Sequence, residues 1–315
     1  MSATRRPSVV PAPAPLAALA LGALALAGCA RSSRMTDEHA GHAAETRTTT
    51  TSTSTSTTRT TVASSLPAGA TDARARLERS PRHGEWAMVR TSAGDSVRAW
   101  VVYPERATKA PVVLVVHEIF GLSPWIRAVA DQLAAEGFIA IAPDLLTGKG
   151  VGGTADSADA QAAVAAVRQL QASEVQARLL AVAQYGMGLP AATQKYGIVG
   201  FCWGGTAAFQ HAAFSPTLSA AVPYYGGVNA SFDLTKAKAA VFANYGENDA
   251  RVNATIPAAD SALKAAGVPW QYQTYAGAGH GFLRQQDGQN GANMTATQQA
   301  WPRTVAWFKQ HLEAN

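Results

Sequence analysis

Tyr196-Gly-Ile-Val-Gly-Phe-Cys-Trp-Gly-Gly205 is the stretch of this sequence that decides the fold. Its apolar residues 196–200 predict a buried strand, and residues 204–214 predict a helix. Between them, Gly200-x-Cys202-x-Gly204 is the cysteine version of the nucleophile elbow, a turn too cramped for side chains at the two glycines. The turn places the cysteine at a helix N-terminus, where partial positive charge stabilises a thiolate or an oxyanion. A small buried cysteine in a glycine-rich turn is the plain alternative.

Strands alternate with helices on both sides of this stretch, which predicts a mostly parallel sheet covered by helices on both faces. Two alternating segments at the start read as an antiparallel hairpin, and Pro302 either kinks the last helix or marks its start. We expect one α/β domain over 81–315, with strands at 85–91, 96–103, 111–116, 138–142, 196–200, 218–225, 239–245 and 270–275, and helices at 124–136, 155–186 (in one or two pieces), 204–214, 256–266 and 296–312.

Two partners for the cysteine follow in the order that this kind of site requires, first an acid and then a histidine. Asp249 ends one predicted strand and His280 follows the next, so both lie where the active sites of open α/β sheets are found. His280 would hold the thiol proton as general base, and Asp249 would orient its ring. Separately, Asp249 could cap the next helix, Glu247 could compete as the acid, and His280 could be an exposed loop residue.

The loop His117-Glu118-Ile119-Phe120-Gly121 follows the first long buried strand. In such a sheet this loop supplies one backbone donor for the negative oxygen of a tetrahedral intermediate. We predict that the N–H groups of Ile119 and Trp203 form this oxyanion hole. Glu118 could hydrogen-bond the thiol of Cys202 or accept its proton, and its plain alternative is an exposed or salt-bridged acid.

These motifs together resemble the dienelactone hydrolase (carboxymethylenebutenolidase) family. The resemblance runs from about Gly84 to the C-terminus, and the set is far more specific than any single element. It rests on 117–121, 200–205, Asp249 and His280-Gly281-Phe282.

The resemblance implies an α/β-hydrolase fold with Cys202, His280 and Asp249 as the catalytic triad. It implies that Glu118 helps to activate the cysteine when substrate binds. It also implies that Arg284, four residues after the catalytic histidine, holds a carboxylate of the substrate, for which a guanidinium fork is well suited.

The sequence departs from the family's pattern in two ways. The family's second carboxylate-binding arginine comes from the region before the long helix, and 148–159 contains no Arg; Arg168 lies further on and does not align clearly. The family's catabolic members are cytoplasmic, whereas this chain begins with an apparent export signal. Both departures bear on the substrate more than on the chemistry.

Residues 1–29 resemble a bacterial lipoprotein signal peptide. Arg5 and Arg6 precede an apolar run too short to span a bilayer, and the run ends in Leu26-Ala27-Gly28-Cys29, which resembles a lipobox. We therefore predict a lipid on Cys29 and an exported protein anchored to the bacterial cell envelope; an ordinary secretory signal or an uncleaved anchor is the alternative. Residues 30–80, rich in Thr and Ser, are expected to be a disordered tether.

Charge and cysteine content exclude other classes. The net charge is +5, but residues before Ser80 carry 9 Lys/Arg against 5 Asp/Glu and the remainder 17 against 16, so the folded part lacks the basic face of a nucleic-acid binder. Two cysteines, Cys29 and Cys202, rule out a disulfide framework. His39 and His42 have no further ligands nearby and are assigned no metal.

The sequence thus predicts a hydrolase that acts without metal or cofactor, as a monomer, on a small ester or lactone through a thioester on Cys202. A broader exported carboxylesterase is the alternative within the same chemistry. A non-catalytic envelope lipoprotein is the alternative outside it, and erosion of the triad would be its sign. A thiol redox role lacks a resolving cysteine once Cys29 carries a lipid.

Overall fold

The computed structural model describes residues 65–151 and 160–313. The predicted signal peptide 1–29, the lipid site Cys29 and most of the predicted tether 30–80 lie outside these residues. Within the described ranges, no helix is long and apolar enough to span a membrane.

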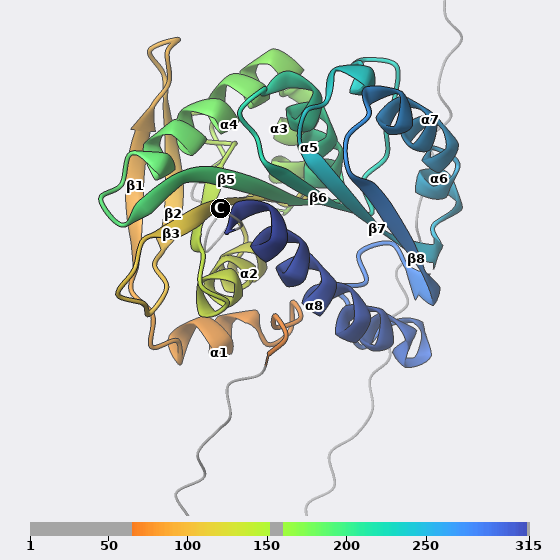
Figure 1. The fold of residues 1–315 in the computed structure, drawn as a ribbon. Helices are drawn as coiled ribbons and strands as arrows, with labels where there is room; N and C mark the ends of the chain where they lie inside the picture. The colour runs from red at the N-terminus through yellow and green to blue at the C-terminus, as the bar shows by residue number, and fades with distance from the viewer. Residues whose placement is uncertain (1–64, 152–159, 314–315) are drawn as a thin grey trace, which may run out of the picture. The chain divides into compact units, whose positions relative to one another are not determined.

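A sheet of eight strands forms the centre of the fold (Figure 1). The first two strands pair antiparallel as the predicted hairpin, the second is antiparallel to β4, and all other neighbours are parallel. The mostly parallel sheet predicted from the sequence is therefore confirmed. Its order is β1 (Gly84–Arg90), β2 (Ser96–Val102), β4 (Ile139–Asp144), β3 (Ala110–Val116), β5 (Ala192–Phe201), β6 (Ala220–Tyr224), β7 (Ala240–Asn248) and β8 (Trp270–Gly279).

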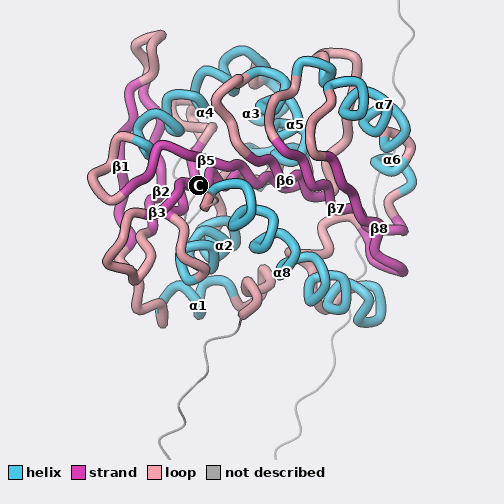
Figure 2. Tube along the Cα trace, in the orientation of Figure 1, coloured by secondary structure: helices cyan, strands magenta, loops and turns pink. Residues whose placement is uncertain are grey.

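Helices cover both faces of the sheet, as the trace in Figure 2 also shows. The alternation of β3 explains why: Val113 and Val115 pack with α2 and α8, whereas Val112 and Leu114 pack with α4 and α5 on the other face. The helices are α1 (Ala73–Glu78), α2 (Pro124–Ala135), α3 (Ala160–Gln169), α4 (Ala172–Met187), α5 (Trp203–Phe214), α6 (Ala250–Asn253), α7 (Ile256–Ala266) and α8 (Ala292–Leu312), with short 3₁₀ turns at Leu234–Lys236 and Gln289–Gly291.

Local sequence accounts for most helix boundaries. Ser123 accepts a hydrogen bond from Ile126 N at 3.5 Å, and Pro124 occupies the first turn, so α2 begins there. The helix ends before Gly137, whose φ of 103° favours glycine. Pro302 lies inside α8, so it does not mark the start of that helix.

Residues 66–82 differ from the prediction of a disordered tether that continues to residue 80. Here α1 buries Ala73, and Leu77 packs against the core. Arg82 forms a buried ion pair with Asp131 of α2 at 2.5 Å. The Thr/Ser-rich composition stops before this segment, and its apolar and paired residues gain enough contact to order it.

Candidate active site

Cys202 stands at the turn between β5 and α5, with φ 55° and ψ −115°. A positive φ is costly for a side chain with a Cβ and persists only where the surroundings enforce it. A Cβ on Gly200 would collide with the carbonyl of Gly204, and a Cβ on Gly204 would lie 2.5 Å from the carbonyl oxygen of His117. The glycines are therefore required where the sequence places them, and the thiol is half-buried at the start of the helix.

His280 follows β8, and its Nδ1 lies 2.5 Å from Oδ2 of Asp249, which follows β7. Asp249 is 7% exposed and also caps α6 through a bond from Val252 N at 3.4 Å, so capping and contact with the histidine coexist. Glu247, the competing acid, is exposed and accepts a hydrogen bond from Gly277 N at 2.8 Å. The structure thus brings Asp249, not Glu247, to the ring.

The contact between His280 and Asp249 shifts the pKa values of both residues. Burial alone would lower the pKa of His280, but the bond to Asp249 and the adjacent Cys202 side chain outweigh it and raise the pKa to about 9. Burial acts to raise the pKa of Asp249, yet the bond from His280 lowers it overall. With Nδ1 engaged by the carboxylate, Nε2 is the ring nitrogen available to the thiol.

Glu118 is 4% exposed and lies beside Arg284, with Oε2 2.7 Å from the guanidinium Nε. The contact is an ion pair between a buried carboxylate and a partly exposed guanidinium. Burial raises the pKa of Glu118 to about 7, although the charges of Arg284 and His280 oppose the increase. Arg284 also stacks over the ring of Phe120, 5.0 Å from its centre.

The two predicted oxyanion donors belong to segments that pack together. Trp203 is the first residue of α5, whose first N–H groups have no acceptor within the helix. The Trp203 ring stacks on His117 with ring centres 5.6 Å apart. Ile119 and Trp203 both pack against a small buried cluster made of Leu146, Ala163 and Val167. Their role as donors stays a prediction.

Tyr225 is a site residue that the sequence did not single out. It follows β6 with a φ of 37°, is fully buried, and its ring centre lies 5.0 Å from that of His280. Burial, followed by the nearby charges of Glu118 and Cys202, raises its pKa well above the usual range. Its position after a buried parallel strand, like those of Asp249 and His280, was the available signal.

Arg168, which does not align clearly with the family's second arginine, lies on α3 and lines a cavity of about 330 Å³ together with Phe120. Within residues 65–151 and 160–313, no three His, Cys, Asp or Glu side chains are grouped so that they could hold a metal ion.

A family model, curated relatives and solved structures place this chain among known proteins. The model of the Dienelactone hydrolase family matches residues 97–312. A Salmonella typhimurium protein named "Putative carboxymethylenebutenolidase" is 33% identical over 233 residues, covering 70% of this chain and 85% of that protein. "Protein usf" of Aquifex pyrophilus is 31% identical over 229 residues, covering 70% and 95%. The crystal structure of a "Putative Dienelactone Hydrolase" from Klebsiella pneumoniae has a TM-score of 0.64 at 28% identity, covering 73% of this chain and 99% of that one.

Proposed function

This chain belongs to the dienelactone hydrolase family and is a hydrolase with the α/β-hydrolase fold, and from that premise we propose that it opens ester or lactone bonds with Cys202 as the nucleophile. The observation that carries the proposal is the contact between His280 and Asp249 next to the strained elbow that holds the cysteine. An acid, a histidine and a thiol in this order and setting are what nucleophilic acyl transfer requires.

The proposed reaction has two halves. The thiol proton rests on His280, and the Cys202 sulfur attacks the carbonyl carbon to give a tetrahedral oxyanion held by the N–H groups of Ile119 and Trp203. Collapse breaks the carbon–oxygen bond, and His280 gives its proton to the leaving alkoxide. A water molecule then loses a proton to His280 and attacks the thioester, which releases the acid and restores the thiol.

Arg284 and Glu118 favour a substrate that carries a carboxylate. The guanidinium of Arg284 is only partly exposed and already holds one carboxylate, that of Glu118. A substrate carboxylate on Arg284 would compete with Glu118 and free this acid to accept or share the thiol proton. That exchange fits the activating role that the family resemblance implies for Glu118.

The site also suits a broader carboxylesterase acting on small neutral esters. The absence of Arg from 148–159 favours this second reading, because a single guanidinium selects acidic substrates less strongly than two. Erosion of the triad would be the sign of a non-catalytic envelope protein, and the contact between Asp249 and His280 shows no such erosion.

Hydrolysis by the full chain in mild detergent tests the proposal, with a dienelactone and a neutral aryl ester as substrates and Cys202→Ala as the control. Opening of the lactone only when Cys202 is present supports the dienelactone hydrolase reaction. If only the neutral ester is cleaved, the proposed mechanism stands, but the natural substrate is an acyl compound other than a dienelactone. No reaction with either substrate contradicts the proposal.

We also propose that the protein is exported and attached to the bacterial cell envelope through a lipid on Cys29. The support is the lipobox-like end of the apolar run at 26–29 and the Thr/Ser-rich segment that follows it. Several acyl chains on one cysteine would hold the protein firmly at a membrane.

A further inference from the structure

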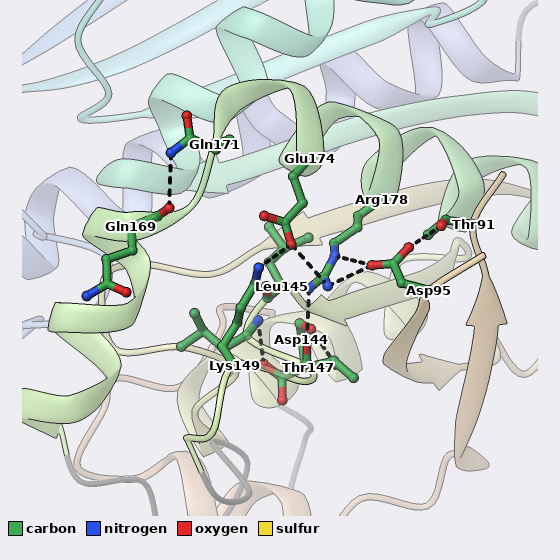
Figure 3. Close-up of polar contacts among 11 residues, drawn as sticks. Thr91, Asp95, Asp144, Leu145, Thr147, Lys149, Gln169, Gln171, Glu174 and Arg178 are labelled. Carbon is green, nitrogen blue, oxygen red and sulfur yellow. Dashed lines mark hydrogen bonds and ion pairs between the residues drawn. The ribbon is translucent and has the colours of Figure 1, made fainter. Parts of the chain in front are cut away.

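One buried arginine outside the site contacts acceptors through all three of its guanidinium nitrogens. Arg178 of α4 has a side chain that is 5% exposed, although it is charged. Its Nη1 donates to the carbonyl oxygens of Leu145 at 2.8 Å and Thr147 at 3.1 Å, and its Nε and Nη2 donate to Asp95 at 3.1 and 2.7 Å (Figure 3). Nη2 also lies 3.1 Å from Glu174. The guanidinium thus donates four hydrogen bonds, to Leu145 O, Thr147 O and twice to Asp95 Oδ2, and makes one further ion-pair contact with Glu174.

The surrounding charges tighten this arrangement. Glu174 also pairs with Lys149 at 2.6 Å, and Thr91 donates to Asp95, as Figure 3 shows. Two acids therefore compensate the buried cation, which would otherwise be costly to remove from water. The Arg178 network, meaning Arg178 with Asp95, Glu174 and the two carbonyls, joins α4, the turn between β1 and β2, and the loop after β4.

The loop that Arg178 holds lies against the predicted oxyanion hole. Leu146, between the two bonded carbonyls, is 1% exposed and belongs, with Ala163 and Val167 of α3, to the small buried cluster against which Ile119 and Trp203 pack. The ring of His117 stacks on Trp203; burial lowers the pKa of His117, and the negative charge of Asp144, the last residue of β4, opposes that decrease. Movement of this loop would therefore be transmitted to both donor segments.

We infer that Arg178 is a positioning residue, which fixes the loop after β4 so that the cluster containing Leu146 holds the N–H groups of Ile119 and Trp203 in place for the oxyanion. The inference rests on the proposed function, because it assigns a support to that function's oxyanion hole. Oxyanion donors stabilise charge only when they are held at the position where it develops, so loss of their support should slow the chemical steps.

Arg178→Lys keeps the charge but offers three donors on one atom, which cannot bridge both carbonyls and Asp95. Arg82→Lys is the matched control, because Arg82 is also a buried arginine, 6% exposed and paired with Asp131, and it does not contact the loop after β4. Both variants should lose thermal stability. Only Arg178→Lys should lower kcat for a neutral aryl ester, by about tenfold, with KM little changed.

The rate at which iodoacetamide alkylates Cys202, measured on the peptide that contains this residue, distinguishes a positioning role of Arg178 from a merely structural one. This reaction needs the thiolate but forms no oxyanion, so its rate should be little changed in Arg178→Lys while kcat falls. An equal fall in alkylation and turnover, or the same loss of kcat in Arg82→Lys, overturns the inference.

Asp95→Asn provides a milder variant in case Arg178→Lys does not fold. Asp95 is 41% exposed, and its substitution leaves Arg178 in place with a weaker partner. A smaller loss of kcat with unchanged alkylation is expected, and an unchanged kcat overturns the inference. An unmodified protein that hydrolyses no ester overturns the proposed function itself, and the role of Arg178 with it.

Discussion

Oε2 of Glu118 lies 2.7 Å from Nε of Arg284, so an ion pair joins the loop after β3 to the turn after His280. The sequence left three environments open for Glu118: in contact with the thiol, exposed to solvent, or in a salt bridge. In the structure the acid is buried and faces the arginine that the family resemblance assigns to the substrate. The residue proposed to bind substrate and the residue proposed to activate the thiol are therefore linked directly by an ion pair.

Replacing Arg284 should weaken binding of acidic substrates selectively. In Arg284→Ala, KM for a carboxylate-bearing lactone should rise by about tenfold or more, because a charge-assisted contact is lost. KM for a neutral aryl ester should change little. Arg303→Ala, an exposed arginine on α8, is the control and should leave both values unchanged. An equal rise for the neutral ester would count against the clamp.

Replacing Glu118 should remove a pH dependence of stability. Burial raises the pKa of Glu118 from 4.5 to about 7, so in this range the folded protein retains a proton that the unfolded chain releases. Raising the pH from about 4.5 to about 7 therefore favours unfolding through this group. Urea unfolding across this range should show a shallower decline in Glu118→Gln than in the unmodified protein, whereas Glu105→Gln, at an exposed position, should keep the full slope.

Replacing Asp249 should lower the pKa of His280, because Asp249 is the main partner that raises it. The pKa of His280 is raised from 6.5 to about 9, so its contribution to stability is complete below 6.5 and is lost as the pH rises through 9. In the unmodified protein the melting temperature should therefore fall as the pH rises from 6.5 through 9. Asp249→Asn should make this fall smaller and should lower kcat by about a hundredfold or more. Glu247→Gln is the control, and a comparable loss in it would reinstate Glu247 as the acid.

Adding one methyl group at Gly204 should destabilise the elbow. The new Cβ would lie 2.5 Å from the His117 carbonyl oxygen and 2.6 Å from that of Val116, and neither backbone atom can move freely. Gly204→Ala should lower the free energy of unfolding by about 1–3 kcal/mol or more, measured by urea titration. Gly227→Ala, where the nearest atoms belong to the Thr255 side chain at 3.5 Å, should be nearly neutral.

Replacing Cys29 should abolish attachment of a lipid. In a bacterial host fed radiolabelled palmitate, the unmodified chain and Cys202→Ser should both incorporate label, and Cys29→Ser should not. Persistent labelling of Cys29→Ser would exclude Cys29 as the lipid site.

The sequence by itself determined the order of strands and helices and the places of Cys202, Asp249 and His280. Periodicity and turn residues are local properties, and the carboxyl ends of parallel strands meet at one edge of a sheet. The strands and helices of the central sheet follow those local rules, so the α/β fold could be predicted from the sequence. The ordered structure of segment 66–82 could not be predicted, because it depends on contacts with α2, against which the segment packs.

Only the tertiary structure decided which polar groups meet. Glu118 faces Arg284, Tyr225 lies against His280, and Arg178 holds the loop after β4. Each pair is far apart in the sequence, and each contact depends on how helices and loops pack over the sheet. The raised pKa values of Glu118 and His280 have the same origin, because burial and neighbouring charge exist only after the chain has folded.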